Sequence, residues 1–298
     1  MTDKKYIIDA LVCLGKTVTD FIGGKDRNPA IAKAIESSCI DNYWFTEENI
    51  LRALDALATE MLDAGKLNEW INRYPPDNRN PQRTGLIMAG NIPLVNFHDF
   101  LSILLSGNIA VIKPSSKDRY LIKTLCGILS DRFPSLSERI VFTDAKPQDI
   151  RAVIATGSNN SARYFRAEYR NIPLLERKNR YSLAVLDGNE SSRELEDLGD
   201  DIFSYFGLGC RNVSNMFVPK NYDWTVFFNS MKKYSHVLNH PGYNDCFRYQ
   251  KALSELSGEK YLTDGFVIIR ENNLTFSSIA AINYKVYENT EQVKTFLS

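Results

Sequence analysis

Cysteine and histidine are scarce in this sequence, and neither type is grouped. The five cysteines lie far apart along 298 residues: Cys13, Cys39, Cys126, Cys210 and Cys246. No C-x-x-C pair occurs, so the sequence indicates neither a disulfide framework nor a zinc knuckle. The three histidines are too few and too isolated for a His-rich site. We therefore expect no metal site.

An excess of charge of one sign is absent as well. Lys plus Arg and Asp plus Glu both number 36, so no overall charge attracts nucleic acid or a membrane surface. No apolar run approaches the ~20 residues that a membrane span requires. The N-terminal Met-Thr-Asp-Lys-Lys leads into a helical pattern and not into a signal peptide. We expect no nucleic-acid partner, no membrane span and a cytoplasmic protein.

The sequence also lacks the G-x-G-x-x-G fingerprint, which argues against the ordinary pyrophosphate turn of a Rossmann domain. A relaxed P-loop pattern does occur, from Ala10 to Gly15-Lys16-Thr17. It lies within residues 4–22, where apolar side chains recur at helical spacing, and no buried strand precedes it. We expect a helix there and no phosphate site.

The pattern that is present is that of an α/β protein long enough for two domains. Helical periodicity covers residues 4–22 and 47–71, and a proline-rich linker follows over 74–82. Beyond the linker we predict strands over 85–89, 109–113, 139–142 and 152–155, and helices over 93–106, 119–133 and 147–150. This βαβα order predicts a mostly parallel, doubly wound sheet with helices on both faces.

The second half of the chain continues to mix the two kinds of element. We predict two strands within 172–187, a helix over 195–206, a strand over 215–219, helices near 223–233 and 244–256, strands near 265–270 and 279–287, and a last helix from Thr290. The fold class is therefore α/β, with a doubly wound domain followed by a second α/β domain.

Polar turns follow three of the predicted strands: Gly90-Asn91, Lys113 to Lys117, and Thr156-Gly157-Ser158. Ligands of doubly wound sheets bind at the carboxyl ends of the strands, so these turns are candidates for a binding site. A helix beginning at Pro93 would place its positive N-terminus near an anionic group. Two other interpretations stay open, because Gly-Asn is common turn chemistry and the lysine-containing segment could be a solvated loop.

Cys210 is the candidate nucleophile. It follows Gly207-Leu208-Gly209 at the end of the helix predicted to reach Phe206, where the absence of side chains lets a carbonyl substrate approach. The alternative is that Cys210 packs like a small apolar residue, as many free cysteines do.

Taken together, these segments resemble the aldehyde dehydrogenase superfamily, and within it the acyl-CoA reductase family that includes the fatty-acid reductase of bacterial bioluminescence. Five stretches carry the resemblance, in family order from about residue 85 to 220: Ala89-Gly90-Asn91-Ile92-Pro93, residues 107–118, Ala155-Thr156-Gly157-Ser158, Leu175-Glu176-Arg177, and Gly207-Leu208-Gly209-Cys210-Arg211-Asn212.

The resemblance implies roles for individual residues. Cys210 matches the catalytic cysteine, and Glu176, 34 residues earlier (210 − 176), matches the general base. Asn91 matches the asparagine that forms an oxyanion hole with the cysteine N–H. The implied cofactor-binding residues are Lys113, Ser115, Ser116, Lys117, Gly157 and Ser158. Without the family context, Glu176 beside several cations reads equally as a surface ion pair.

Three departures from the family pattern affect the expected chemistry. Members that prefer NAD carry a glutamate where this chain has Ser116, and Lys117 follows, so the resemblance favours NADPH. The stretch 274–278 lacks the acid that usually holds the nicotinamide ribose. The family's returning C-terminal segment is also missing, so we expect a shortened chain.

The resemblance implies NADPH-dependent reduction of an acyl thioester, on coenzyme A or on a protein, to an aldehyde through an acyl-cysteine. An NAD(P)-dependent aldehyde dehydrogenase releasing acid and a non-catalytic cofactor-binding scaffold are the alternatives. We expect N-terminal helices and a cofactor domain over 1–175 and a catalytic cysteine domain over 176–298. An acyl-transferring partner protein and a homo-oligomer are further expectations.

Overall fold

The chain divides into two compact units, Met1–Asn179 and Arg180–Ser298, each built around its own sheet. The computed structural model describes residues 4–74, 80–178, 180–272 and 278–297. Most of the predicted linker over 74–82 and of the stretch 274–278 therefore lies outside the described residues. Among those described, no helix has both the length and the apolar character that a membrane crossing needs.

Helices form the N-terminal part of the first unit: α1 (Lys4–Ile22), α2 (Pro29–Asp41), α3 (Glu47–Ala56), the π-helical η1 (Leu57–Met61) and α4 (Ala64–Ile71). The predicted helix over 4–22 is confirmed, and the P-loop-like residues lie inside it. The helical region predicted over 47–71 forms as α3, η1 and α4, and α4 starts where the Asp63 side chain accepts a hydrogen bond from the Lys66 N–H.

Helix α2 is missing from the sequence prediction, although its start has a recognisable signal. The Asn28 side chain accepts hydrogen bonds from the N–H groups of Ala30 and Ile31, and Pro29 occupies the first turn. An asparagine cap followed by proline is typical of a helix N-terminus.

The rest of the first unit alternates strands and helices: β1 (Arg83–Ile87), α5 (Phe97–Leu105), β2 (Ile109–Lys113), α6 (Tyr120–Arg132), η2 (Pro134–Arg139), β3 (Ile140–Phe142), β4 (Ala152–Thr156), α7 (Asn159–Glu168) and β5 (Leu174–Arg177). The strand order is β3-β2-β1-β4-β5, and all neighbours are parallel. Because the chain builds outward from β1 first through β2 and then through β4, the doubly wound prediction is confirmed, with a topological switch point between β1 and β4.

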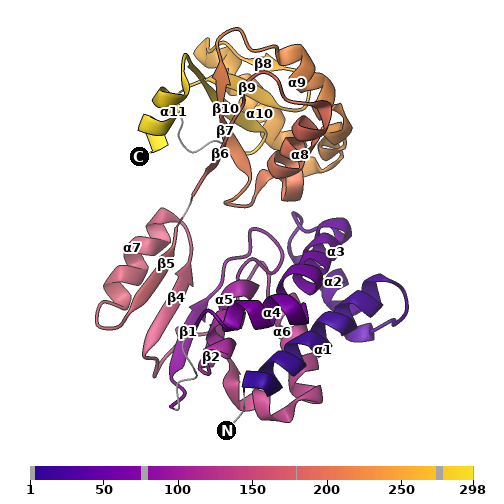
Figure 1. Ribbon diagram of the computed structural model, residues 1–298, viewed down its shortest axis with the longest axis vertical. Coiled ribbons are helices and arrows are strands. Elements are labelled where there is room, and N and C mark those ends of the chain that lie inside the picture. The colour runs from indigo at the N-terminus through magenta and orange to yellow at the C-terminus, as the bar shows by residue number, and fades with distance from the viewer. Residues whose placement is uncertain (1–3, 75–79, 179, 273–277, 298) are drawn as a thin grey trace. The chain divides into compact units, whose positions relative to one another are not determined.

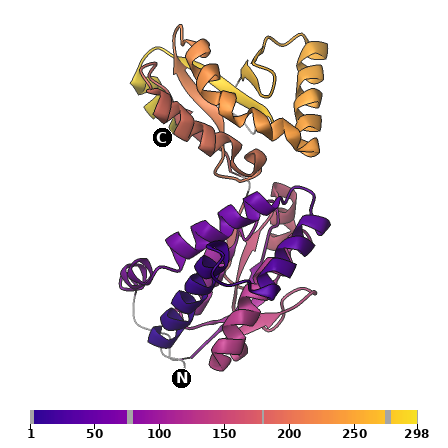
Figure 2. The ribbon, with the colours of Figure 1, turned by 90° about the vertical axis from the view of Figure 1, so that its right-hand side faces the viewer.

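Alternating side chains give the sheet two buried faces. Leu86 belongs to the large core made with the N-terminal helices, whereas Ile87, its neighbour on β1, packs with Val153 and Tyr169 on the other face. Figure 1 shows α7 on one side of the strands and α5 and α6 on the other. Figure 2 shows the indigo and violet helices of residues 4–71 on the same face of the sheet as α5 and α6.

One prediction for this unit is wrong, and one helix was not predicted. No helix forms over 147–150, where Asp149 has a positive φ of 53° that interrupts any helical turn. Helix α7 was not predicted, because its sequence from Asn159 to Glu168 is polar and has no wide apolar stripe.

The second unit contains β6 (Ser182–Val185), α8 (Ser192–Phe203), η3 (Ser204–Gly207), β7 (Val213–Pro219), α9 (Trp224–Met231), η4 (Lys232–Asn239), α10 (Pro241–Ser257), β8 (Leu262–Thr263), β9 (Ile268–Glu271), β10 (Ala281–Tyr287) and α11 (Thr290–Leu297). Its sheet has the order β6-β7-β10-β9-β8 and is parallel except for the β8–β9 pair. Figure 1 shows α11 on one side of these strands and α8 and α9 on the other.

Candidate active site

Cys210 lies on an exposed loop between α8 and β7 of the second unit. Helix α8 ends at Phe203 and not at Phe206 as predicted, because three successive residues adopt left-handed backbone: Tyr205 (φ 53°), Phe206 (φ 60°) and Gly207 (φ 73°). Left-handed backbone at two large residues is strained and persists only where the surrounding structure holds it. Cys210 is exposed, so it does not pack as a buried small apolar residue.

The Asn212 side chain holds this loop in place. Its Oδ1 accepts a hydrogen bond from the Gly209 N–H at 2.8 Å, and its Nδ2 donates to the carbonyls of Asp201 at 2.8 Å and Ser204 at 3.0 Å. One amide thus ties the residue before Cys210 to the end of α8. This role of Asn212 was not predicted from the sequence, although asparagine side chains commonly bond the backbone of turns.

A small cavity of about 40 Å³ lies beside the loop, within the second unit. Its lining includes Phe206, Gly207, Asn212 and Tyr243. The Phe206 ring packs against His240, with ring centroids 4.4 Å apart. This volume exceeds that of one water but is too small for an extended acyl chain.

Asn91 lies exposed in the turn that follows β1 in the first unit. The helix after it, α5, begins at Phe97 and not at Pro93 as predicted. Leu94 has a positive φ of 55°, and its N–H donates to the Asp118 Oδ2 at 2.7 Å instead of entering a helix. The turn carrying Asn91 is therefore shaped by a bond to a residue 24 positions away, which local sequence does not reveal.

The loop after β2 packs directly against this turn. A side chain at Gly90 would come within 2.7 Å of the Ser115 Oγ and 3.0 Å of the Asp118 N, so only glycine fits there. The Asn42 Nδ2 donates to the carbonyls of Gly90 at 3.3 Å and Lys117 at 3.1 Å, which joins the two segments to the end of α2. Ser116 and Lys117 are exposed on the loop surface.

Asp118 lies beneath this loop and is 2% exposed. Its Oδ1 is buried and accepts no hydrogen bond from any residue that the structure describes. Loss of hydration raises the pKa of the Asp118 carboxyl to about 7, and the bond from the Leu94 N–H opposes this rise. The sequence did not predict this buried carboxyl.

Gly157 and Ser158 form the turn between β4 and α7. The Ser158 Oγ accepts from the Ser161 N–H at 3.2 Å, which makes Ser158 the N-cap of α7. A side chain at Gly157 would approach the Ser161 Cβ to 2.8 Å. This turn follows β4, and β4 pairs with β1, so it lies at the same edge of the sheet as the turn after β1.

Glu176 lies on β5 and is held by two cations. Arg166 of α7 donates from Nε to Oε1 at 2.6 Å and from Nη2 to Oε2 at 2.8 Å, and the Lys178 Nζ lies 3.2 Å from Oε2. The Glu176 side chain is 13% exposed, compared with 53% for Arg166. The hydrogen bonds from Arg166 lower the pKa of Glu176 and are the largest cause of that shift. Both carboxylate oxygens are thus engaged by cations.

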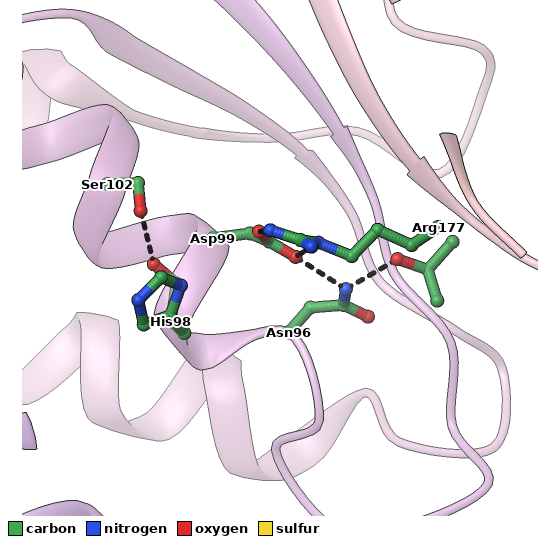
Figure 3. Close-up of polar contacts among 6 residues, drawn as sticks. Asn96, His98, Asp99, Ser102 and Arg177 are labelled. Atoms are coloured by element: carbon green, nitrogen blue, oxygen red, sulfur yellow. Dashed lines mark hydrogen bonds and ion pairs between the residues drawn. The ribbon is translucent and has the colours of Figure 1, made fainter. Parts of the chain in front are cut away.

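A buried polar network joins the carboxyl ends of β1, β4 and β5 (Figure 3). The Asn96 Nδ2 donates to Asp99 at 3.0 Å and to the Thr156 Oγ1 at 2.6 Å, and its Oδ1 accepts from the Ala89 N–H at 2.9 Å. The Arg177 Nη2 donates to the Asp99 Oδ1 at 2.6 Å. Asn96 and Asp99 are 1% and 3% exposed. This network was not predicted from the sequence, although a carboxylate inside the apolar helix α5 is a signal for a buried polar partner.

The structure therefore collects several predicted site residues at one edge of the first sheet, including Asn91, Lys113, Ser158 and Glu176. The edge lies at the switch point between β1 and β4, where dinucleotides bind in doubly wound folds. Cys210 belongs to the second unit.

Comparison with protein families finds one match within the chain. The family described as Acyl-CoA reductase (LuxC) matches residues 42–229. No curated protein matches the sequence.

Solved structures of similar architecture cover nearly the whole chain. The oxidoreductase from Marinobacter aquaeolei has a TM-score of 0.69 at 14% identity, over 96% of this chain and 70% of that one. Glyceraldehyde-3-phosphate dehydrogenase from Methanocaldococcus jannaschii, complexed with NADP, has a TM-score of 0.69 at 14% identity, over 96% and 72%. Betaine aldehyde dehydrogenase from Staphylococcus aureus has a TM-score of 0.67 at 9% identity, over 98% and 68%. At these identities the likeness establishes the fold, which is that of the aldehyde dehydrogenases.

Proposed function

The chain belongs to the acyl-CoA reductase (LuxC) family, and from this premise we propose that it reduces an acyl thioester to an aldehyde with NADPH. The family resemblance and the aldehyde dehydrogenase-like fold class predicted from the sequence are confirmed. Family and fold together make the protein an oxidoreductase of the aldehyde dehydrogenase superfamily. The thioester substrate, the cofactor and the site residues belong to the proposal.

The observation that carries the proposal is the exposed Cys210 on a loop held by Asn212. In the proposed reaction the Cys210 thiolate forms a bond to the carbonyl carbon of the thioester. The resulting oxyanion accepts hydrogen bonds from the Asn91 side-chain amide and from the Cys210 N–H. The bond from carbon to the departing thiol then breaks, that thiol takes up a proton, and the acyl group remains on Cys210. When bound, NADPH supplies the hydride that reduces this acyl group, and the aldehyde leaves as the Cys210 sulfur is released.

The edge of the first sheet fits a dinucleotide phosphate. Ser158 and the first turn of α7 supply N–H donors and a favourable helix dipole for the pyrophosphate. Lys113 and Lys117 supply cations, and position 116 carries a serine hydroxyl and no carboxylate. The carboxyl group of Asp118 is buried beneath the loop and bonded to Leu94, so it does not repel a 2′-phosphate at the surface. These features favour NADPH over NADH.

The test follows NADPH absorbance with acyl-CoA thioesters of graded length, and identifies the aldehyde by chromatography. We expect the wild-type protein to oxidise NADPH with at least one thioester, and Cys210→Ala to be inactive. Cys246→Ala is the matched control, because this partly buried cysteine of α10 has no role in the proposal. NADPH oxidation that survives in Cys210→Ala would refute the mechanism. A protein that binds NADPH but reduces no thioester, on coenzyme A or on a carrier protein, would support the scaffold alternative.

A further inference from the structure

The geometry around Glu176 bears on the fate of an acyl group attached to Cys210. Such an acyl-enzyme has two outcomes, reduction to an aldehyde or hydrolysis to an acid. In hydrolysis the oxygen of a water molecule bonds to the acyl carbon, and a base accepts the proton of that water. The carbon–sulfur bond then breaks, the Cys210 thiolate leaves and a carboxylic acid is formed. Hydrolysis therefore requires a base with an available lone pair.

Glu176 occupies the position that the family resemblance assigns to this base, but its carboxylate is already engaged. Arg166 contacts both oxygens through the planar fork of its guanidinium, at 2.6 and 2.8 Å, and Lys178 adds a second cation at 3.2 Å. The bidentate geometry, and not burial, holds the carboxylate, because the Arg166 side chain is 53% exposed. A carboxylate stabilised in this way accepts a proton from water less readily.

We propose that Arg166 determines the product of the reaction, by holding Glu176 away from a hydrolytic water so that the acyl-enzyme persists until it is reduced. This inference rests on the proposed function. Arg166 acts through Glu176 and is therefore a positioning residue. The same contacts explain how one fold can serve an aldehyde-forming reductase while retaining the glutamate that suits an acid-forming enzyme.

The experiment measures acid release from the best acyl-CoA substrate without NADPH, and the aldehyde-to-acid ratio with NADPH. The variant Arg166→Gln removes the bidentate contact, and we expect acid release to rise by about tenfold, a modest part of what a general base contributes. The double variant Arg166→Gln/Glu176→Gln should return acid release to the wild-type rate, because the effect passes through Glu176. Arg166→Lys keeps the positive charge but loses the two-pronged contact of the guanidinium. Its rate of acid release should fall between those of the wild type and Arg166→Gln.

Arg73→Gln provides the matched control, because Arg73 is an exposed arginine of the first unit that pairs with Glu69. We expect it to release acid at the wild-type rate. The pH dependence of acid release is a second readout. In Arg166→Gln the low-pH limb of the pH–rate profile for acid release should move to higher pH, because the contact that lowers the pKa of Glu176 is gone. A merely structural role of Arg166 would not move that limb.

Failure of this inference differs from failure of the proposed function. If wild-type protein gives no stoichiometric release of coenzyme A that depends on Cys210, the proposed function is wrong. If that release occurs but Arg166→Gln hydrolyses no faster than wild type, the inference is overturned. It is also overturned if acid release stays elevated in the double variant.

Discussion

Asp118 is a residue whose charge depends on the fold. Its carboxyl lies beneath the loop after β2, where Oδ2 accepts from the Leu94 N–H and Oδ1 is buried. Folding raises its pKa to about 7, compared with about 3.9 in an unfolded chain. Between these values the folded protein holds a proton that the unfolded chain has released. Because the folded protein holds this proton more tightly, the contribution of Asp118 to the free energy of unfolding is highest below about pH 4 and falls as the pH rises to 7.

This linkage predicts the behaviour of Asp118→Asn, which keeps an acceptor oxygen for the Leu94 N–H but does not titrate. The free energy of unfolding of the variant relative to wild type should increase between pH 4 and pH 8, by up to about 4 kcal/mol. Urea unfolding at several pH values measures it. Asp41→Asn is the control of opposite sign, because Arg119 lowers the pKa of Asp41. Its stabilisation is present throughout pH 4 to 8 and is lost only as the pH falls below about 4. A pH-independent difference for Asp118→Asn would contradict the prediction.

Helix α8, which leads into the Cys210 loop, depends on close packing at Gly199. A side chain there would overlap the ring of Tyr234 in η4, and the Tyr234 hydroxyl donates to the Glu196 carbonyl of the same helix. Tyr234 also stacks on Phe203 at the end of α8, with ring centroids 5.1 Å apart. The approach of η4 therefore anchors the helix from which the cysteine loop begins.

Two helical glycines make a matched pair for testing this packing. Gly199→Ala should lower the free energy of unfolding of the second unit by about 1–3 kcal/mol, because the methyl group forces the ring of Tyr234 aside. Gly127→Ala on α6 meets no atom within 4 Å and should raise stability by up to about 1 kcal/mol, as alanine normally does in a helix. Chemical denaturation followed by circular dichroism distinguishes them. Equal stabilities would show that α8 and η4 do not pack as described.

At the scale of the whole molecule, the two units have separate sheets and separate cores. The residues proposed to bind NADPH all lie in the first unit, and the proposed nucleophile lies in the second. NADPH at about a hundredfold excess over its Kd should therefore stabilise the first unit by about 2.7 kcal/mol. Hydrogen exchange should locate the protection in residues 88–91, 113–118 and 157–161.

NADH is the control ligand for this measurement, and we expect it to protect these segments less at the same concentration. Ser116→Glu should reverse the preference, because a carboxylate on the loop accepts ribose hydroxyls but repels a 2′-phosphate. Equal protection by NADPH and NADH in the wild-type protein would rule out the proposed specificity.

The sequence by itself determined the elements whose signal is local. The helix over 4–22 and the strand over 109–113 form where predicted, because an apolar stripe and a continuous apolar run each specify one kind of element. The parallel, doubly wound sheet followed from the alternation of such segments, because parallel neighbours require a crossover helix. The ordered motifs were sufficient to identify the family.

The tertiary structure alone decided the features made by residues distant in the sequence. Helix α5 starts at Phe97 because Asp118 holds Leu94, and Asp99 is buried because Arg177, 78 positions away, pairs with it. Glu176 forms its ion pair because α7 brings Arg166 to it, and the polar sequence of α7 gives no pattern that predicts a helix. A side chain's hydrogen bonds and charge depend on which groups surround it in space. Local sequence patterns predict turns and buried positions, but they do not predict which side chain of another helix or strand will form a hydrogen bond or an ion pair with a given residue.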